Sequence, residues 1–268
     1  MMGWQGTGPA YAASYADLCA GTSGPIVAAL GAPDGGTLLD VGAGPGDVSA
    51  LLARAGWAVT ACEPEESMRD VARERHPALR MEPGGLPVLP YADDAFDAVV
   101  ANFVLNHVED PRASARELGR VSRLVAVATT WVVSPSWFWA SVVTRAGLPE
   151  APPARLAPEN DFERSVDGFE GMLRDAGWEE GDRRVSVREH SWVWRVRPAA
   201  LWASVEGGVA GAGARFVGLD DRERRRFRAA FEEIVDEHAE DGMLPLRHTA
   251  AVAVTTNAPR TMGETADN

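Results

Sequence analysis

The chain contains no lysine: all 26 basic residues among its 268 positions are arginine. A Schiff-base lysine, the lysine of a phosphate-binding P-loop and a lysine general base are therefore excluded. Positive charge is scarce overall, because 39 acidic residues leave a net charge of −13. Binding to a nucleic-acid backbone needs clustered positive charge, so nucleic acid is not an expected partner.

Cysteines and long apolar runs are scarce as well. The two cysteines, Cys19 and Cys62, lie far apart and lack the spacing of metal ligands, which favours buried thiols in a reducing cytosol over a disulfide framework. No stretch approaches the roughly 20 apolar residues of a membrane span, and no secretory signal is visible. We therefore expect a cytoplasmic protein that binds neither a membrane nor a metal ion.

Residues 37–131 alternate short apolar runs with amphipathic ones. The apolar runs predict strands at 37–41, 58–62, 79–81, 96–104 and 124–130, and the amphipathic runs predict helices at 48–55, 65–75 and 111–122. Such alternation implies parallel strands with helices on both faces. The predicted class is α/β: a Rossmann-like, doubly wound, mostly parallel seven-stranded sheet with helical insertions capping the active-site edge.

After Trp131 this pattern breaks, because prolines between 134 and 164 are too frequent for one continuous helix. Beyond them we expect a helix at 167–176, a strand at 184–194, a helical stretch at 198–240 and a last strand at 247–256. We expect one domain over residues 1–256, with a helical lid at 1–30, a binding core at 37–131 and capping insertions at 132–246. The polar tail at 257–268 is predicted to be disordered.

The most informative segment is Asp40-Val41-Gly42-Ala43-Gly44-Pro45-Gly46, which leaves a predicted strand and enters a helix. Its glycines let the backbone turn tightly and let a ligand approach where side chains would clash. Glu63 ends the next predicted strand, 21 residues after Gly42. A carboxylate there can accept hydrogen bonds from both hydroxyls of a ribose, so the two features predict a nucleoside-binding crevice.

The glycine spacing does not match a dinucleotide site. Asp47 stands where the third glycine of that fingerprint belongs, and an acid at a helix N-terminus repels a pyrophosphate. If the fingerprint is read from Gly44 to Ser49 instead, it matches only in part. A nicotinamide-dependent reductase therefore remains one alternative. A cationic ligand without phosphate would tolerate the acid.

Three further motifs follow the glycine loop in order: Glu63-Pro64 with Ser67-Met68, Leu89-Pro90-Tyr91-x-Asp93-x-x-Phe96-Asp97, and Asn106-His107-Val108 before a helix that opens at Pro111. Together these residues resemble the class I S-adenosylmethionine-dependent methyltransferases, in their small-molecule, methyltransferase-11-like branch. The resemblance covers residues 37–131 well and the rest of the chain loosely.

The resemblance implies S-adenosyl-L-methionine as cofactor, with S-adenosyl-L-homocysteine as product. It places Asp40 and the glycine loop around the amino acid end, Glu63 at the ribose and Met68 near the adenine. The family often has an aspartate where this chain has Gly85, so the Leu86 backbone would hold the adenine instead. The residues expected to bind the cofactor are thus Tyr15, Asp40, Gly42, Ala43, Gly44, Gly46, Glu63, Pro64, Met68, Gly85, Leu86 and Asn102.

Candidates for the acceptor side lie at strand ends and in the variable second half. His107 is either a proton acceptor at the methyl-presenting edge or a structural histidine, and Asn106 could orient the substrate. Several tryptophans there either fill the core or wall the substrate pocket. Trp192 and Trp194 alternate along one strand, so they share a face. The expected substrate contacts are Asn106, Trp131, His190, Trp192 and Trp194.

These observations predict an enzyme that transfers a methyl group from S-adenosylmethionine to an oxygen or nitrogen of a small molecule or modified peptide in bacterial specialised metabolism. The protein is expected to be a monomer or homodimer. Besides the reductase, one more alternative is a methyltransferase fold used for binding or for non-methylating chemistry. Ligand binding and turnover distinguish the three.

Overall fold

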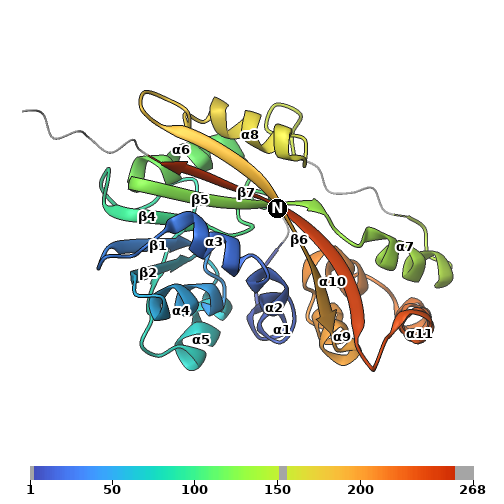
Figure 1. The fold of residues 1–268 in the computed structure, drawn as a ribbon. Coiled ribbons are helices and arrows are strands. Elements are labelled where there is room, and N and C mark those ends of the chain that lie inside the picture. Colours follow the sequence, from blue (N-terminus) through green and yellow to red (C-terminus); the bar gives the residue numbers. More distant parts are fainter. Residues whose placement is uncertain (1–2, 151–155, 257–268) are drawn as a thin grey trace, which may run out of the picture.

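A computed structural model describes residues 3–150 and 156–256, and its centre is one seven-stranded sheet (Figure 1). The strands lie in the order β3-β2-β1-β4-β5-β7-β6. They are β1 Thr37–Val41, β2 Ala58–Glu63, β3 Arg80–Pro83, β4 Phe96–Ala101, β5 Ser122–Val133, β6 Arg184–Val196 and β7 Leu244–Thr256. The first five are parallel, whereas β7 runs antiparallel to both β5 and β6. The predicted mostly parallel, doubly wound α/β fold is confirmed.

Helices cover both faces of this sheet. α6 (Pro111–Val121) and α8 (Val166–Asp175) pack on one face, and α3 (Ser23–Leu30) and α4 (Asp47–Arg54) pack on the other. The adjacent residues Leu38 and Leu39 of β1 are both fully buried, each in the hydrophobic cluster of a different face. This explains why the central strands are continuous apolar runs rather than alternating ones.

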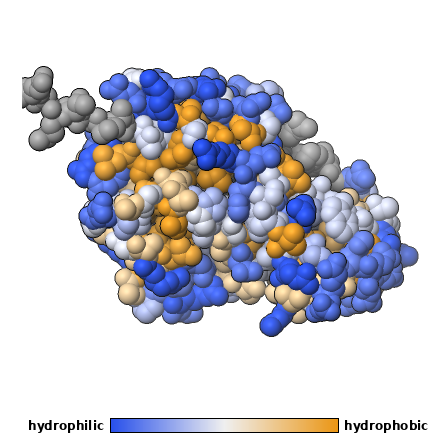
Figure 2. All heavy atoms as spheres, viewed as in Figure 1, coloured by the Kyte–Doolittle hydropathy of each residue, from blue (hydrophilic) through white to orange (hydrophobic). Residues whose placement is uncertain are grey.

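A second group of helices packs around the long antiparallel strands β6 and β7, beyond the parallel strands (Figure 1). It consists of α7 (Ser136–Arg145), α9 (Pro198–Glu206), α10 (Ala210–Val217) and α11 (Asp221–His238). The part of the surface over α9–α11 that Figure 2 shows is mostly hydrophilic, while Phe227 and Phe231 of α11 are buried in the cluster beneath. The apolar faces of these helices therefore point inward.

The N-terminal residues form α1 (Gly8–Ala12) and α2 (Tyr15–Ala20) ahead of α3. α1 rests on α5 (Glu66–Arg75), where the Gly8 backbone N–H donates to Ser67 Oγ at 3.0 Å. A Cβ at Gly8 would lie 2.3 Å from the Ser67 carbonyl oxygen, so only glycine permits this approach. The predicted N-terminal segment is thus helical and lies against the binding core.

Some boundaries differ from the prediction. β7 begins at Leu244 rather than at 247, because pairing with β6 continues through Pro245 to the Val196–Leu244 pair. Proline cannot donate to a strand ladder, and this made residues 244–246 look unlike a strand. The predicted helical stretch 198–240 is three helices, and the predicted disordered tail 257–268 lies outside the described residues. No helix in the described part of the chain combines the length and apolar character that crossing a bilayer requires.

Candidate active site

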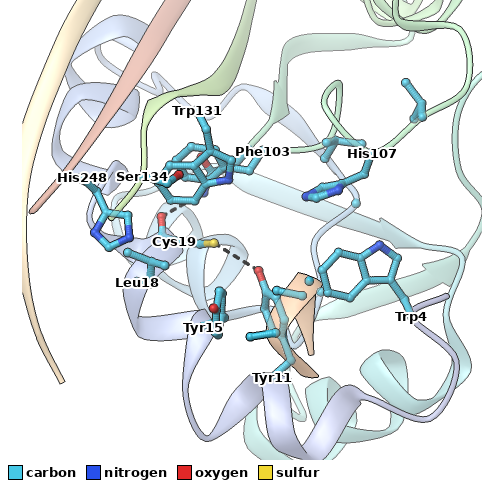
Figure 3. A pocket seen from close by; sticks show the side chains of 18 of the residues that line it. Trp4, Tyr11, Tyr15, Leu18, Cys19, Phe103, His107, Trp131, Ser134 and His248 are labelled. Carbon is cyan, nitrogen blue, oxygen red and sulfur yellow. Dashed lines mark hydrogen bonds between the residues drawn. The ribbon is translucent and has the colours of Figure 1, made fainter. Parts of the chain in front are cut away.

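A cavity of about 1000 Å³ opens where β1, β2 and β4 end and continues between the N-terminal helices and α7, α9, α10 and α11. Pockets for small ligands and cofactors span roughly 300–1,000 Å³, so this cavity is large enough for two bound molecules. Figure 3 shows side chains from the N-terminal helices and from the ends of β4, β5 and β7 gathered around it. The carboxyl ends of parallel strands are the usual binding edge of such a sheet.

The glycine loop forms one wall of the cavity. Gly42 and Gly44 line it, with φ values of +68° and +56°, which glycine adopts without strain. A Cβ at Gly42 would lie 2.6 Å from Val104 Cγ2, so this position has no room for a side chain. Ala43 and Gly46 are not among the residues that line the cavity; a Cβ at Gly46 would meet Leu79 instead.

Two buried carboxyl groups sit at the base of the loop. Asp40 is 1% exposed, and burial raises its pKa to about 7, although a hydrogen bond of 2.5 Å from Ser49 Oγ works in the opposite direction. Burial also raises the pKa of Glu63. Two like charges that are both desolvated favour a cationic ligand, which would compensate them. Asp40 lies beneath the lining and Glu63 is part of it.

Glu63 holds the loop and the next helix together. Its Oε2 accepts the Gly44 N–H at 2.9 Å and its Oε1 accepts the Glu65 N–H at 2.8 Å. The cavity wall continues from Glu63 through four residues that the sequence predicted, namely Pro64, Met68, Gly85 and Leu86. A Cβ at Gly85 would lie 3.2 Å from Pro64 Cγ, so the small residue lets the two segments approach.

Asn102 follows β4 and joins the sheet to the N-terminal helices. Its Oδ1 accepts hydrogen bonds from Thr22 Oγ1 at 2.8 Å and Thr129 Oγ1 at 2.7 Å, and its Nδ2 donates to the Cys19 carbonyl at 3.0 Å. Asn102 and Tyr15 of α2 both line the cavity, and their contact with a cofactor stays a prediction. Desolvation by burial raises the pKa of Tyr15 to about 12, so its phenol is neutral.

The N-terminal segment brings two more aromatic rings that the sequence did not single out as site residues. Tyr11 lies 3.7 Å from the position of a Cβ on Gly44, and its hydroxyl donates to Cys19 Sγ at 3.2 Å (Figure 3). Trp4 packs edge-on against His107, with ring centroids 5.1 Å apart. Both residues line the cavity, so the segment before α2 covers the loop and the end of β4.

His107 lies in the cavity wall, in the turn after β4. Burial, with a smaller contribution from the charge of Arg164, lowers its pKa to about 4. The imidazole is therefore neutral near pH 7 and has a lone pair that can accept a proton. Asn106 is not in the lining, and its Oδ1 is buried without a hydrogen-bond partner among the described residues.

An aromatic wall stands on the acceptor side. Trp131 stacks on Phe103, with ring centroids 3.7 Å apart and planes inclined by 8°. Phe103 has φ +58°, a left-handed conformation that costs a bulky residue energy and that occurs most often at functional sites. Its N–H donates to Thr129 Oγ1 at 2.8 Å, which fixes this conformation. Both rings line the cavity.

The structure divides the predicted residues of β6. Trp194 lines the cavity and donates from Nε1 to Asp17 Oδ2 at 3.0 Å. Trp192 does not line it, because Gly21 packs directly on its indole. His190 lies outside the lining too, and its Nε2 is 3.0 Å from the Gly21 carbonyl oxygen. The junction between α2 and α3 thus covers both side chains.

His248 of β7 is a site residue that the sequence analysis missed. It is 4% exposed, lines the cavity and lies among the rings of Trp131, Trp192 and Trp194. Its Nδ1 is 3.0 Å from the Leu246 carbonyl oxygen, so the neutral ring donates there and leaves Nε2 as an acceptor. Desolvation lowers its pKa, which favours that neutral form. A histidine in a strand without a motif gives no local signal of such a role.

Comparison with known proteins agrees with this geometry. Residues 39–124 match the protein family described as a methyltransferase domain. The demethylmenaquinone methyltransferase of Renibacterium salmoninarum is 38% identical over 98 residues, which are 37% of this chain and 41% of that protein. The protein of the same name in Streptomyces griseus is 28% identical over 167 residues, or 57% and 73% of the two chains. The chain spans less than half the length of the first two such relatives, 41% and 46%.

Solved structures show the same fold. The YcgJ protein of Bacillus subtilis has a TM-score of 0.55 at 16% identity, covering 88% of this chain and 97% of its own. The [4+2]-cyclase SpnF has a TM-score of 0.51 at 20% identity, covering 91% and 82%. One of these proteins is named a cyclase. The shared fold therefore does not by itself decide which reaction this chain catalyses.

Proposed function

We propose that this chain, which contains a methyltransferase domain of the class I S-adenosylmethionine-dependent type, transfers the methyl group of S-adenosylmethionine to an oxygen or nitrogen of a small, mostly apolar molecule. The observation that carries the proposal is the continuity of one cavity. It joins the glycine loop and Glu63 to the aromatic wall of Phe103 and Trp131. A nucleoside cofactor and an apolar acceptor can therefore occupy the same enclosed space.

The residues at the cofactor end fit S-adenosylmethionine. Gly42 and Gly44 leave space for the amino acid part, Glu63 offers carboxylate oxygens to the ribose, and Met68 and Leu86 give an apolar surface for the adenine. Two buried acids with raised pKa values, Asp40 and Glu63, match a ligand that carries a sulfonium and an ammonium group better than a pyrophosphate.

The bound cofactor would supply a methyl group that its sulfonium makes reactive. The protein contributes position and a dry environment: the stacked rings of Phe103 and Trp131 orient a flat acceptor, and the lid residues Trp4 and Tyr11 shield the loop from water. His107 and His248 are both neutral lining histidines, so either can take the proton that an acceptor hydroxyl or amine loses.

Calorimetric titration with S-adenosylhomocysteine tests the cofactor. We expect binding by the wild type and none by Gly44→Val, because the valine side chain would occupy the space below Tyr11. Gly35→Val is the matched control: Gly35 has φ +75° and open surroundings, so that variant carries the same backbone strain but should bind normally. No binding by the wild type at millimolar ligand contradicts the proposal.

The two alternatives predict other results. A nicotinamide-dependent reductase would bind NADH and not S-adenosylhomocysteine. A methyltransferase fold used for another reaction, as in the cyclase named above, would bind the cofactor without turnover. Incubation with methyl-labelled S-adenosylmethionine and candidate acceptors, read as incorporation of one methyl group by mass spectrometry, distinguishes the last case from methyl transfer.

The names of the relatives suggest one further acceptor for that screen, demethylmenaquinone, which would take the methyl group on a ring carbon instead of on an oxygen or nitrogen. Its flat bicyclic ring suits the Phe103–Trp131 wall. However, the family match ends at residue 124, before the helices α7, α9, α10 and α11 that wall the acceptor end. The family match therefore gives no information about the acceptor end, and aromatic metabolites other than quinols belong in the same screen.

A further inference from the structure

In the described part of the chain, one arginine lines the acceptor end of the cavity. Arg215 lies on α10, where the cavity wall is formed by Ala210, Gly211, Ala212 and Arg215. The spacing of residues 211, 212 and 215 places them on one helical face, and that face is turned to the cavity. The other charged lining residues among those the structure describes are acidic: Glu63, Glu109, Asp110 and Glu150.

Among the residues that the structure describes, none neutralises the guanidinium of Arg215. Its Nη2 donates to the Pro149 carbonyl oxygen, which holds the side chain in place. Its Nε is buried and has no hydrogen-bond partner, and no carboxylate of the described residues lies within ion-pair distance of the group. Arg145 of α7 is a contrast, because Glu237 pairs with it at the surface.

Apolar side chains form the rest of this end. Val143 of α7, Leu201 of α9 and Phe227 of α11 line the cavity there, together with Trp139. The side chain of Arg215 is partly exposed, but its Nε–H is buried without an acceptor among the described residues, and leaving it unpaired is costly unless an anion or another acceptor in the cavity completes it. The planar guanidinium fork is suited to carboxylates, which it binds through two parallel hydrogen bonds.

We propose that the methyl acceptor is an aromatic carboxylate, whose carboxylate pairs with Arg215 while its ring lies along the apolar wall. Arg215 is then a specificity-determining residue. The inference rests on the proposed function, in which this end of the cavity receives the acceptor. Glu150 lines the same cavity without pairing with Arg215, so its charge weakens the binding of such an anion.

The test is a pair of matched probes, 2-naphthoate and its neutral analogue 2-naphthamide, titrated into protein saturated with S-adenosylhomocysteine. Quenching of tryptophan fluorescence reports binding, because Trp131, Trp139 and Trp194 line the cavity. We expect the wild type to bind 2-naphthoate more tightly than 2-naphthamide. Arg215→Gln should lower the affinity for 2-naphthoate about 10- to 100-fold, the usual effect of losing a charge-assisted pair. It should change the affinity for 2-naphthamide less than about threefold.

Three further variants sharpen the result. Arg145→Gln removes an arginine outside the cavity and should bind both probes like the wild type. Arg215→Lys keeps the charge without the fork, so it should retain part of the preference for the carboxylate. Glu150→Gln should raise the affinity for 2-naphthoate and leave that for 2-naphthamide unchanged. If Arg215→Gln is poorly folded, which loss of S-adenosylhomocysteine binding would reveal, the Lys and Glu150 variants decide.

The outcomes separate the two proposals. Equal binding of both probes by the wild type, no binding of either, or equal losses for both probes in the folded Arg215 variants overturns the inference while cofactor binding stands. If S-adenosylhomocysteine does not bind, the proposed function fails. The same titrations without it then still show whether Arg215 selects carboxylates.

Discussion

The buried carboxyl of Asp40 should make the protein without its ligand less stable as pH rises, and Asp40→Asn should remove this penalty. Asp40 is 1% exposed, and desolvation raises its pKa from 3.8 to about 7. Because the folded state holds the proton more tightly than the unfolded chain, the contribution to stability is full below pH 4 and is lost as pH rises through 7. Asparagine resembles the protonated acid and keeps an oxygen for Ser49 Oγ.

The magnitude follows from the shift. A difference of about three pKa units at roughly 1.4 kcal/mol per unit gives about 4 kcal/mol. The free energy of unfolding of Asp40→Asn should therefore exceed that of the wild type by less than ~1 kcal/mol near pH 4 and by about 4 kcal/mol near pH 8. Taking the difference in the free energy of unfolding between the two proteins at each pH removes the contributions of all other titrating groups. Groups coupled to Asp40, such as Glu63, are the exception.

Urea unfolding of both proteins between pH 4 and 8, without ligand, measures this gap. Ser49→Ala is the matched control with the opposite sign, because it removes the hydrogen bond that lowers the pKa of Asp40 and should steepen the loss of stability. A stability difference that does not change with pH, or a wild type that is more stable than Asp40→Asn at pH 8, would refute the account of Asp40 as a desolvated acid whose charge a bound cation compensates.

Three shorter predictions concern the site and its support. Thr129→Val should lower the free energy of unfolding by about 1–3 kcal/mol, since it leaves the buried Phe103 N–H without an acceptor and removes one of the two hydrogen bonds that Asn102 Oδ1 accepts; it should also weaken S-adenosylhomocysteine binding in calorimetry. Trp178→Phe loses the 2.8 Å bond to the Ala115 carbonyl in a fully buried place; urea unfolding should show a loss of about 2–4 kcal/mol, and an unchanged midpoint would contradict this. His107→Ala should lower kcat about 100-fold or more if this histidine takes the proton, and the wild-type rate should not fall from protonation of His107 above about pH 5, since its pKa is about 4; normal turnover by the variant leaves that role to His248.

The binding core was accessible from the sequence because its signals are local. The strand before Asp40 is a continuous apolar run, the glycines that follow need positive φ values, and Glu63 ends the next strand. Each of these features depends on neighbours within a few residues, so composition and spacing expose it. The structure brings Gly42, Gly44 and Glu63 together at one cavity wall.

The acceptor side was less accessible because its residues meet only through long-range packing. Trp192 and Trp194 follow the same alternation, yet Gly21 covers the first and leaves the second at the cavity. No sequence feature near position 21 predicts that contact with β6. His248 likewise has no motif around it and gains its environment from the rings of β5 and β6.

The sequence by itself determined the α/β alternation, the crevice at the glycine loop and the exclusion of lysine chemistry, because periodicity, turn chemistry and composition are properties of short segments. Only the tertiary structure decided which side chains face the cavity. Trp4, Phe103, Arg215 and His248 come from the N-terminal segment, the end of β4, α10 and β7. They share one cavity because the helices between β6 and β7 pack over the edge of the parallel strands.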